Sequence, residues 1–397
     1  MADKPKIRFK GFTDAWEQRK LGEVFEEYSE KNHEELPALT IIQGGGTVRR
    51  DESDRAIQYD KASLSNYKMV RKDDFILHLR SFEGGLERAT CDGIISPAYH
   101  TFHGDEADSR FYYAFFRSYD FIKRKLVPHI YGIRDGKSID VDGLKSIMVP
   151  YPSYDEQRKI GDFLEGMDNL ITLHQRKCDE LKKVKKFMLQ NLFPKNGEKY
   201  PAIRFEGFTD AWEQRKLGEI ADICGGGTPS TNVSEYWDGD IDWYAPAEIG
   251  EQIYLEGSER KITKLGLEKS SAKMLPVGTV LFTSRAGIGN TAILRKTACT
   301  NQGFQSIIPH IYELDSYFIF SRTPELKKYG ETVGAGSTFV EVSGKQMANM
   351  DITIPSLPEQ KVIGVFFEQV DNLLTLHQRK CDEIKEVKKF MLQNMFA

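Results

Sequence analysis

The sequence DNLITLHQRKCDELKKVKKFMLQNLF at residues 168–193 recurs as DNLLTLHQRKCDEIKEVKKFMLQNMF at residues 371–396, with four differences in twenty-six positions. A second stretch, IRFKGFTDAWEQRKLGE at residues 7–23, recurs at residues 203–219 with a single difference. The copies are shifted by 203 residues in the first case and by 196 in the second. Self-similarity of this kind marks an internal duplication. We therefore predict two repeats, each with a shared head and a shared tail.

The residues between the shared blocks differ from one repeat to the other. We find no convincing register between residues 24–150 and 220–353, apart from loose echoes near the ends. Both middles contain strand-like and helix-like runs, which predicts mixed α/β domains. The strand-like runs are 75–79, 278–282 and 306–309, and the helix-like runs are 108–126 and 315–328. Shared blocks predict one role performed twice, and different middles predict two different roles.

The shared tail predicts a long helix. Apolar or amphipathic residues recur there in alternating steps of three and four, which is typical of a coiled-coil seam. The first series is Ile160, Phe163, Met167, Leu170, His174, Lys177, Leu181, Val184 and Met188. The second repeat has the same series from Ile363 to Met391. Two such helices in one chain pack most simply against each other in antiparallel orientation, related by a pseudo-twofold axis.

These patterns predict an α+β fold with two mixed α/β domains joined by two long antiparallel coiled-coil helices, built on an internal duplication. The expected boundaries are a first globular domain at 1–152, a first helix at 153–193, a linker at 194–202, a second globular domain at 203–355 and a second helix at 356–397.

Composition limits the classes of function. The 55 basic and 59 acidic residues give a formal net charge of −4, so any nucleic-acid binding must come from local patches or be shared with a basic partner. No run of 18 apolar residues is present and the first residues lack an apolar core, so we expect neither a membrane span nor a signal peptide. The five cysteines form no C-x-x-C pair, which favours reduced thiols in a cytoplasmic protein.

No catalytic or metal-binding motif is found. Residues 131–138 (YGIRDGKS) resemble a phosphate-binding loop but have one residue too few between the glycines. His100 and His103 have the spacing of a metal pair, but no cysteine or carboxylate cluster completes it. These absences favour a binding protein over an enzyme, with no metal and no catalytic residue.

Basic, amide and hydroxyl side chains close to glycines or aromatic residues are the candidate DNA-binding groups. Arginine, asparagine and glutamine make paired hydrogen bonds to the edges of guanine and adenine, and glycine-rich loops let the backbone approach phosphate. The candidates are Arg49, Arg50, Arg80, Ser81, Arg134 and Lys137 in the first middle, and Thr228, Arg285, Asn301, Gln302, Ser337 and Thr338 in the second.

The architecture resembles the specificity (S) subunit of type I restriction–modification systems. The motifs that carry the resemblance are Phe-x-Gly-Phe-x-x-x-Trp at 9–16, Lys-Leu-Gly-Glu at 20–23 and Pro-x-x-x-Glu-Gln-x-x-Ile at 152–160, and all three recur in the second repeat. The first middle departs from the second in lacking Gly-Gly-Gly-Thr-Pro soon after Leu-Gly-Glu, where the second has residues 225–229.

The resemblance implies that each middle is a target-recognition domain that reads one half of a bipartite, asymmetric double-stranded DNA site. It implies that the helices space the readers and dock two methyltransferase (M) subunits, and that restriction (R) subunits complete the complex. The chain would then be a non-catalytic recognition subunit of an adenine methyltransferase and restriction complex. It would hold no cofactor, while S-adenosylmethionine, ATP and Mg²⁺ would bind to the partner subunits.

A second interpretation remains open: a coiled-coil adaptor whose two heads bind proteins and have no DNA role. The net charge of −4 favours it slightly. Salt separates the two interpretations, because binding through phosphates weakens steeply as salt rises and an apolar protein contact need not.

Overall fold

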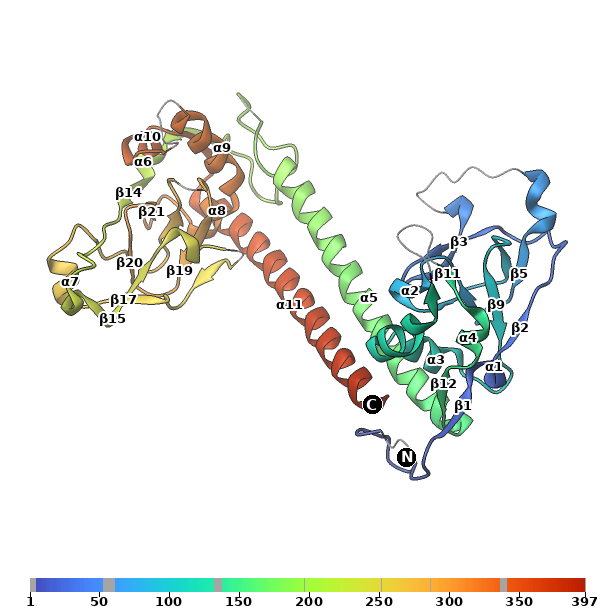
Figure 1. Ribbon diagram of the computed structural model, residues 1–397. Helices are drawn as coiled ribbons and strands as arrows, with labels where there is room; N and C mark the ends of the chain where they lie inside the picture. The colour runs from blue at the N-terminus through green and yellow to red at the C-terminus, as the bar shows by residue number, and fades with distance from the viewer. Residues whose placement is uncertain are drawn as a thin grey trace. The chain divides into compact units, whose positions relative to one another are not determined.

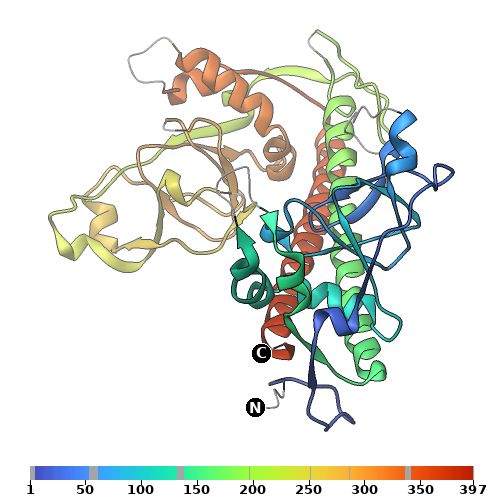
Figure 2. The same ribbon diagram turned by 45° about the vertical axis from the view of Figure 1, so that its right-hand side comes forward.

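The computed structural model describes residues 5–52, 61–131, 138–195, 197–250, 252–285, 287–335 and 341–396, and it divides into two compact units (Figure 1). Unit 1 comprises residues 1–176 and 378–397, and unit 2 comprises residues 177–377. The boundary falls inside each of two long helices, α5 (Tyr154–Asn191) and α11 (Leu357–Met395). Figure 2 shows each of them as one unbroken helix. The five predicted segments follow the repeats, whereas the contacts group half of each helix with each unit.

Unit 1 is a mixed domain of short strands and helices. Its elements are β1 (Glu17–Lys20), α1 (Leu21–Val24), β2 (Glu26–Tyr28), β3 (Leu39–Ile42), β4 (Gly46–Arg49), β5 (Lys68–Val70), β6 (Phe75–Leu77), α2 (Ser81–Gly84), β7 (Glu87–Arg88), β8 (Gly93–Ile95), β9 (His100–His103), α3 (Ser109–Phe116), the π-helix Asp120–Leu126, β10 (Ile130–Tyr131), β11 (Ser138–Ile139), α4 (Val141–Lys145) and β12 (Met148–Tyr151). Its largest sheet has the order β2-β9-β6-β7, and β1 of the shared head pairs with β12 just before α5.

Unit 2 has the same kind of architecture. Its elements are β13 (Glu213–Lys216), α6 (Leu217–Ile220), β14 (Ala221–Gly225), β15 (Trp237–Tyr244), β16 (Tyr254–Leu255), β17 (Arg260–Ile262), α7 (Lys264–Glu268), β18 (Val280–Phe282), β19 (Thr291–Leu294), β20 (Cys299–Thr300), β21 (Gln305–Pro309), α8 (Ser316–Ser321), α9 (Thr323–Gly334), α10 (Gly344–Ala348) and β22 (Asp351–Ile354). Its largest sheet has the order β14-β21-β18-β19-β16, and β13 pairs with β22 just before α11.

The four strands of the central sheet in unit 1 match four of the five strands in unit 2, where β16 is additional. One offset of 205 residues relates the paired positions: Phe75, Arg88 and Phe102 in unit 1, and Val280, Ile293 and Ile307 in unit 2. The same offset relates Asp73 and Gly278, which both have a positive φ just before the equivalent strands β6 and β18. The expectation that the middles lack a common register is therefore wrong for the sheet. Sequence comparison misses it because the strand positions share burial and pairing but not residue type.

In each unit the long helices pack in antiparallel orientation, as predicted. The same two contacts occur in both units: Asp168–Lys388 and Ile171–Cys381 in unit 1, and Asp371–Lys185 and Leu374–Cys178 in unit 2. Within each unit, the residue numbers of the contacts rise along one helix and fall along the other. The paired residues are related by the 203-residue shift of the sequence repeat, so the two units contain the same contacts between the helices.

The predicted seam has the right period, but every second position is displaced by one residue. Ile160 is buried, as predicted, but Cys178 is buried where the prediction placed the exposed Lys177. Leu170 and Val184 are 48% and 45% exposed, outside the seam. At residues 170 and 171 both side chains are apolar, so spacing alone could not decide which of them faces the partner helix. The chain thus has apolar side chains on a second helix face.

Each core includes a phenylalanine from the end of a long helix. Phe396 packs against Trp16, Phe111 and Phe115 in unit 1. Phe193 makes the equivalent contacts with Trp212 and Phe318 in unit 2, and it also packs against Phe367 of α11. Phe396 belongs to the second repeat and Phe193 to the first, so each repeat contributes its last helical turn to the core that contains the head of the other.

Candidate functional site

Three loops of unit 2 leave the same end of its central sheet. Strands β14 and β18 both run antiparallel to β21, so β14 ends, β18 ends and β21 begins at one end, which we call the loop end. The loops there contain four of the six candidates of the second middle: Thr228, Arg285, Asn301 and Gln302. The structure therefore gathers side chains that are more than 70 residues apart in sequence. Ser337 and Thr338 lie outside the described residues.

The glycine-rich loop after β14 lies directly against the loop before β21. A Cβ on Gly226 would lie 2.1 Å from the carbonyl oxygen of Asn301, so only glycine allows this approach. The N–H of Gly227 donates to the carbonyl of Thr300 at 2.8 Å. The Thr228 hydroxyl then donates to Oε1 of Gln302 at 2.5 Å and holds that carboxamide in place. The result is a fixed hydrogen-bonding group on an exposed loop.

Asn301 and Arg285 are placed differently within the same cluster. The Asn301 Oδ1 accepts a hydrogen bond from the N–H of Gly303 at 2.7 Å, so this oxygen shapes its own turn. Backbone hydrogen bonds hold the segment before Arg285, because the N–H of Ser284 donates to the Gly303 carbonyl at 2.8 Å. Among the described residues, the Arg285 side chain has no hydrogen bond or ion pair.

Arg80 of unit 1 lines a cleft at the corresponding end of its sheet. The cleft has a volume of about 750 Å³ and is also lined by Gln43, His78 and Tyr99. His78 is 9% exposed, and its Nε2 has no hydrogen-bond partner among the described residues. Burial, together with the nearby charge of Arg80, lowers the pKa of His78 to about 4, so the ring is neutral near pH 7. The cleft thus combines a cation and a carboxamide, while the unpaired Nε2 of His78 is buried and not presented to it.

The other candidates of the first middle are not gathered in this way. Arg50 donates to the carbonyl of Leu39 at 3.2 Å and lies over the ring of Tyr67, so it contributes to packing. The Ser81 hydroxyl is fully buried and accepts the N–H of His78 at 2.9 Å. Arg49 is exposed at the end of β4. Arg134 and Lys137 lie outside the described residues.

A buried ion pair, which sequence reasoning did not identify, ties the head of each unit to its long helix. Arg8 donates to both carboxylate oxygens of Glu156, at 2.6 and 2.7 Å, and Trp16 donates to the same carboxylate at 3.1 Å. In unit 2, Arg204 makes the same pair with Glu359, with both distances at 2.7 Å. The signal was available, since all these residues recur in the shared blocks.

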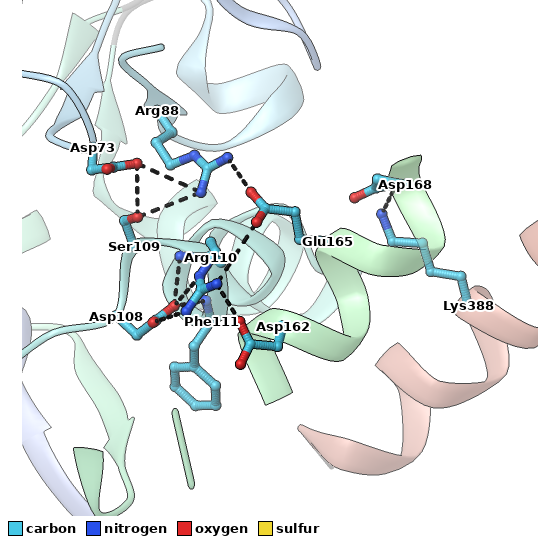
Figure 3. Close-up of polar contacts among 10 residues, drawn as sticks. All are labelled: Asp73, Arg88, Asp108, Ser109, Arg110, Phe111, Asp162, Glu165, Asp168 and Lys388. Atoms are coloured by element: carbon cyan, nitrogen blue, oxygen red, sulfur yellow. Dashed lines mark hydrogen bonds and ion pairs between the residues drawn. The ribbon is translucent and has the colours of Figure 1, made fainter. Parts of the chain in front are cut away.

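The first helix after the central sheet of unit 1 is also fixed to α5 (Figure 3). Asp108 caps α3 by accepting hydrogen bonds from the N–H groups of Arg110 and Phe111. Arg110 pairs with Asp108 at 2.6 Å and with Asp162 of α5. From α5, the Gln157 Oε1 accepts the N–H of Asp108 at 2.9 Å. This network holds α3, and the sheet beneath it, on the long helix.

Unit 2 repeats the cap. Asp315 caps α8, and the Gln360 Oε1 accepts the N–H of Asp315 at 3.0 Å. A Cβ on Gly161 or on Gly364 would lie 2.6 Å from the capping carboxylate of its unit, so both positions need glycine. The shared residues therefore build one frame twice, and the loops at the loop end are what differs.

The family of the chain can now be stated. The model for the "Type I restriction modification DNA specificity domain" matches residues 94–183 and 209–386, more than half of the chain. The chain belongs to this family. Both the predicted family and the predicted fold class are thereby confirmed. No helix within the described ranges is long and apolar enough to cross a membrane.

Members of the specificity-subunit family resemble this chain over part of their length. This chain is 34% identical over 188 residues to the MjaIX type I restriction enzyme specificity subunit of Methanocaldococcus jannaschii. The match covers 47% of this chain and 44% of that protein. It is 30% identical over 169 residues to the EcoR124I/EcoR124II specificity subunit of Escherichia coli, covering 41% of each. Both matches span less than half of the relative.

A solved structure resembles the whole chain. The type I restriction–modification S subunit from M. genitalium covers 99% of both chains, with a TM-score of 0.63 and 15% identity. At this identity the likeness concerns the fold alone. It supports the predicted arrangement of two mixed domains with long helices.

Proposed function

We propose that this chain is the DNA specificity subunit of a type I restriction–modification complex, in which each unit reads one half of a bipartite, asymmetric DNA site. One observation carries the proposal: the same frame occurs twice and presents two different sets of loops at the same end of the sheet. A palindromic site would be read by two equal sets. Two different sets of loops, held by the same arrangement of shared residues, fit a DNA site whose two halves differ in sequence.

The loops carry the chemistry that base reading needs. In unit 2, the carboxamide of Gln302 is held by Thr228, and a fixed carboxamide can pair with the edge of adenine. In unit 1, the carboxamide of Gln43 lines a cleft that can receive a base edge. Phosphate contacts position such readers, and base contacts specify the sequence.

The second apolar helix face supports the docking of methyltransferase subunits. Leu170 and Leu173 of α5 and Val387 and Phe390 of α11 are 48–55% exposed in unit 1. The equivalent residues of unit 2, related by the 203-residue shift, are also exposed: Leu373, Leu376, Val184 and Phe187. A surface that occurs twice fits two copies of one partner, since each copy can make the same contacts.

In this proposal the chain recognises DNA and performs no chemistry. The methyltransferase subunits hold S-adenosylmethionine and methylate adenine after the base is flipped into their pocket. Restriction subunits supply the steps that use ATP and Mg²⁺. The long helices of this chain set the distance between the two readers.

Two measurements test the proposal. The genome of a host that expresses this chain with the methyltransferase subunit of its own system is sequenced for methyladenine, with each subunit alone as a control. We expect methylation at one bipartite, asymmetric sequence, and only when both subunits are present. Affinity of the complex for duplex DNA should fall steeply as salt rises. Methylation by this chain alone, or affinity that does not depend on salt as in a protein adaptor, would contradict the proposal.

A further inference from the structure

Arg80 and Arg285 occupy the same place in the two units. Each is the third residue after the end of the equivalent strands β6 and β18, and the 205-residue offset of the sheets relates them. The residues before them differ: His78 and Leu79 in unit 1, and Thr283 and Ser284 in unit 2. Arginine is thus retained at one position of a loop whose neighbouring residues have changed.

Both guanidinium groups are unpaired in the described part of the chain, as is that of Arg49. Most other arginines of the two domains bind a carboxylate: the pairs are Arg71–Glu30, Arg88–Glu165, Arg117–Glu87, Arg295–Glu256 and Arg322–Glu325. Arg80 is exposed and Arg285 is half-buried. A free guanidinium presents its planar fork of donors, which suits two oxygens of one phosphate.

The surroundings of the two arginines are different. Gln43, His78 and Tyr99 line the cleft with Arg80, whereas the loops at the loop end of unit 2 carry Thr228 and Gln302. A group that reads bases must differ between half-sites that differ. A group that binds phosphate can stay the same, because every DNA sequence has the same backbone.

We propose that Arg80 and Arg285 form one phosphate-binding position that occurs in both units and anchors each reader on the DNA backbone without reading sequence. The surroundings that differ, with Gln43 in unit 1 and the Thr228–Gln302 pair in unit 2, read the bases. This inference rests on the proposed DNA function and assigns the two arginines a role in it.

The test uses the complex of the full chain with its methyltransferase subunits. Affinity for 30-base-pair duplexes, with and without the recognition sequence, is measured between about 50 and 200 mM salt for the R80A, R285A and double variants. Each lost phosphate contact lowers the slope of log affinity against log salt by about 0.9. The loss of affinity over this range should therefore be about threefold smaller in each single variant and about tenfold smaller in the double variant. The methylated sequence should stay unchanged.

Two controls make the result specific. Arg124→Ala removes an exposed arginine that pairs with Asp120 on the π-helix, and it should leave the slope unchanged. Arg80→Lys and Arg285→Lys keep the positive charge but lose the paired donors of the guanidinium. If the arginines bind phosphate, these variants should keep most of the affinity and the full specificity. If they bind a base, the variants should lose specificity. Relaxed recognition at one base in R80A or R285A, or an unchanged slope in both, would overturn the inference. Failure of the wild-type complex to bind DNA would instead overturn the proposed function.

Discussion

Unit 1 and unit 2 share four strands of the central sheet in the same register, yet a loop sequence that both contain lies at different places in the two domains. The sequence Gly-Gly-Gly-Thr makes this plain because it occurs in both. At 44–47 it forms the turn after β3 and the start of β4, whereas at 225–228 it begins with the last residue of β14 and continues into the loop after that strand. The comparison teaches that the frame and the loops vary independently. A short motif shared by two homologous domains does not by itself identify equivalent sites.

The largest expected effect comes from exchanging a whole middle. Replacing residues 220–353 with the equivalent middle of another family member should change one half of the methylated sequence and leave the other half intact. The physical reason is that α11 and the Arg204–Glu359 pair lie in the retained blocks, where Gln360 and Asp371 can accept the same contacts from an equivalent α8. Methylome sequencing of the host reads both halves at once. If both halves changed, the units would not read independently.

Removing the arginine of the buried ion pair should lower the free energy of unfolding more in unit 2 than in unit 1. Arg204→Ala leaves Glu359, which is 1% exposed, without another side-chain donor in the described residues, and should cost about 3–5 kcal/mol. Arg8→Ala leaves Glu156 with the Trp16 indole, so we expect it to cost less. Thermal unfolding of the full chain measures both. The R204A/E359Q double variant removes the buried charge and should recover stability relative to R204A. An equal loss for R8A and R204A would show that the indole does not compensate.

A third prediction concerns the helices that both units share. Four residues inserted after Lys177, with a matched insertion after Lys380, lengthen each helix by about 6 Å and turn it by a little more than one revolution. The seam is nearly kept, so the complex should read the same half-sites with a spacer about 1–2 base pairs longer, at roughly 3.4 Å per base pair. A two-residue insertion rotates the seam by about half a turn and should prevent assembly. Methylome sequencing would refute the role in spacing if an active variant kept its original spacer.

The smallest effect distinguishes the two shared tryptophans. The Trp16 indole donates to Glu156, whereas the buried indole N–H of Trp212 has no partner among the described residues. Trp16→Phe therefore loses a hydrogen bond to a charged group, worth about 1.5–3 kcal/mol, and Trp212→Phe loses none. Both variants remove similar volume, so each serves as the control for the other. Urea unfolding that gave W212F the larger loss would contradict this assignment.

The repeats made much of the fold predictable from sequence. The strands near 75–79, 278–282 and 306–309 are confirmed, because short apolar runs that are buried on both faces leave a local signal. The antiparallel helices followed from a sustained period of 3.5. The choice between Leu170 and Ile171 for the seam could not be made, because two neighbouring apolar residues fit either face.

The candidate site was less predictable, since it depends on contacts between distant loops. Thr228, Gln302 and Arg285 were chosen for their chemistry, and only the sheet brings them together. Ser81 and Arg50 had the same chemistry, but the hydroxyl of Ser81 is enclosed and the guanidinium of Arg50 supports a tyrosine. Residue type predicts what a side chain can bind, whereas burial decides whether it is available.

The exchange of the last helical turns has a consequence for how such a chain could arise. Phe193 belongs to the first repeat but packs with Trp212, and Phe396 belongs to the second but packs with Trp16. A polypeptide of one repeat would lack the phenylalanine that its own tryptophan needs, and would carry one that fits a second copy. Two such polypeptides would complete each other as a domain-swapped homodimer with identical loops. A chain that contains both copies keeps both cores intact, and each set of loops is then free to change without the other.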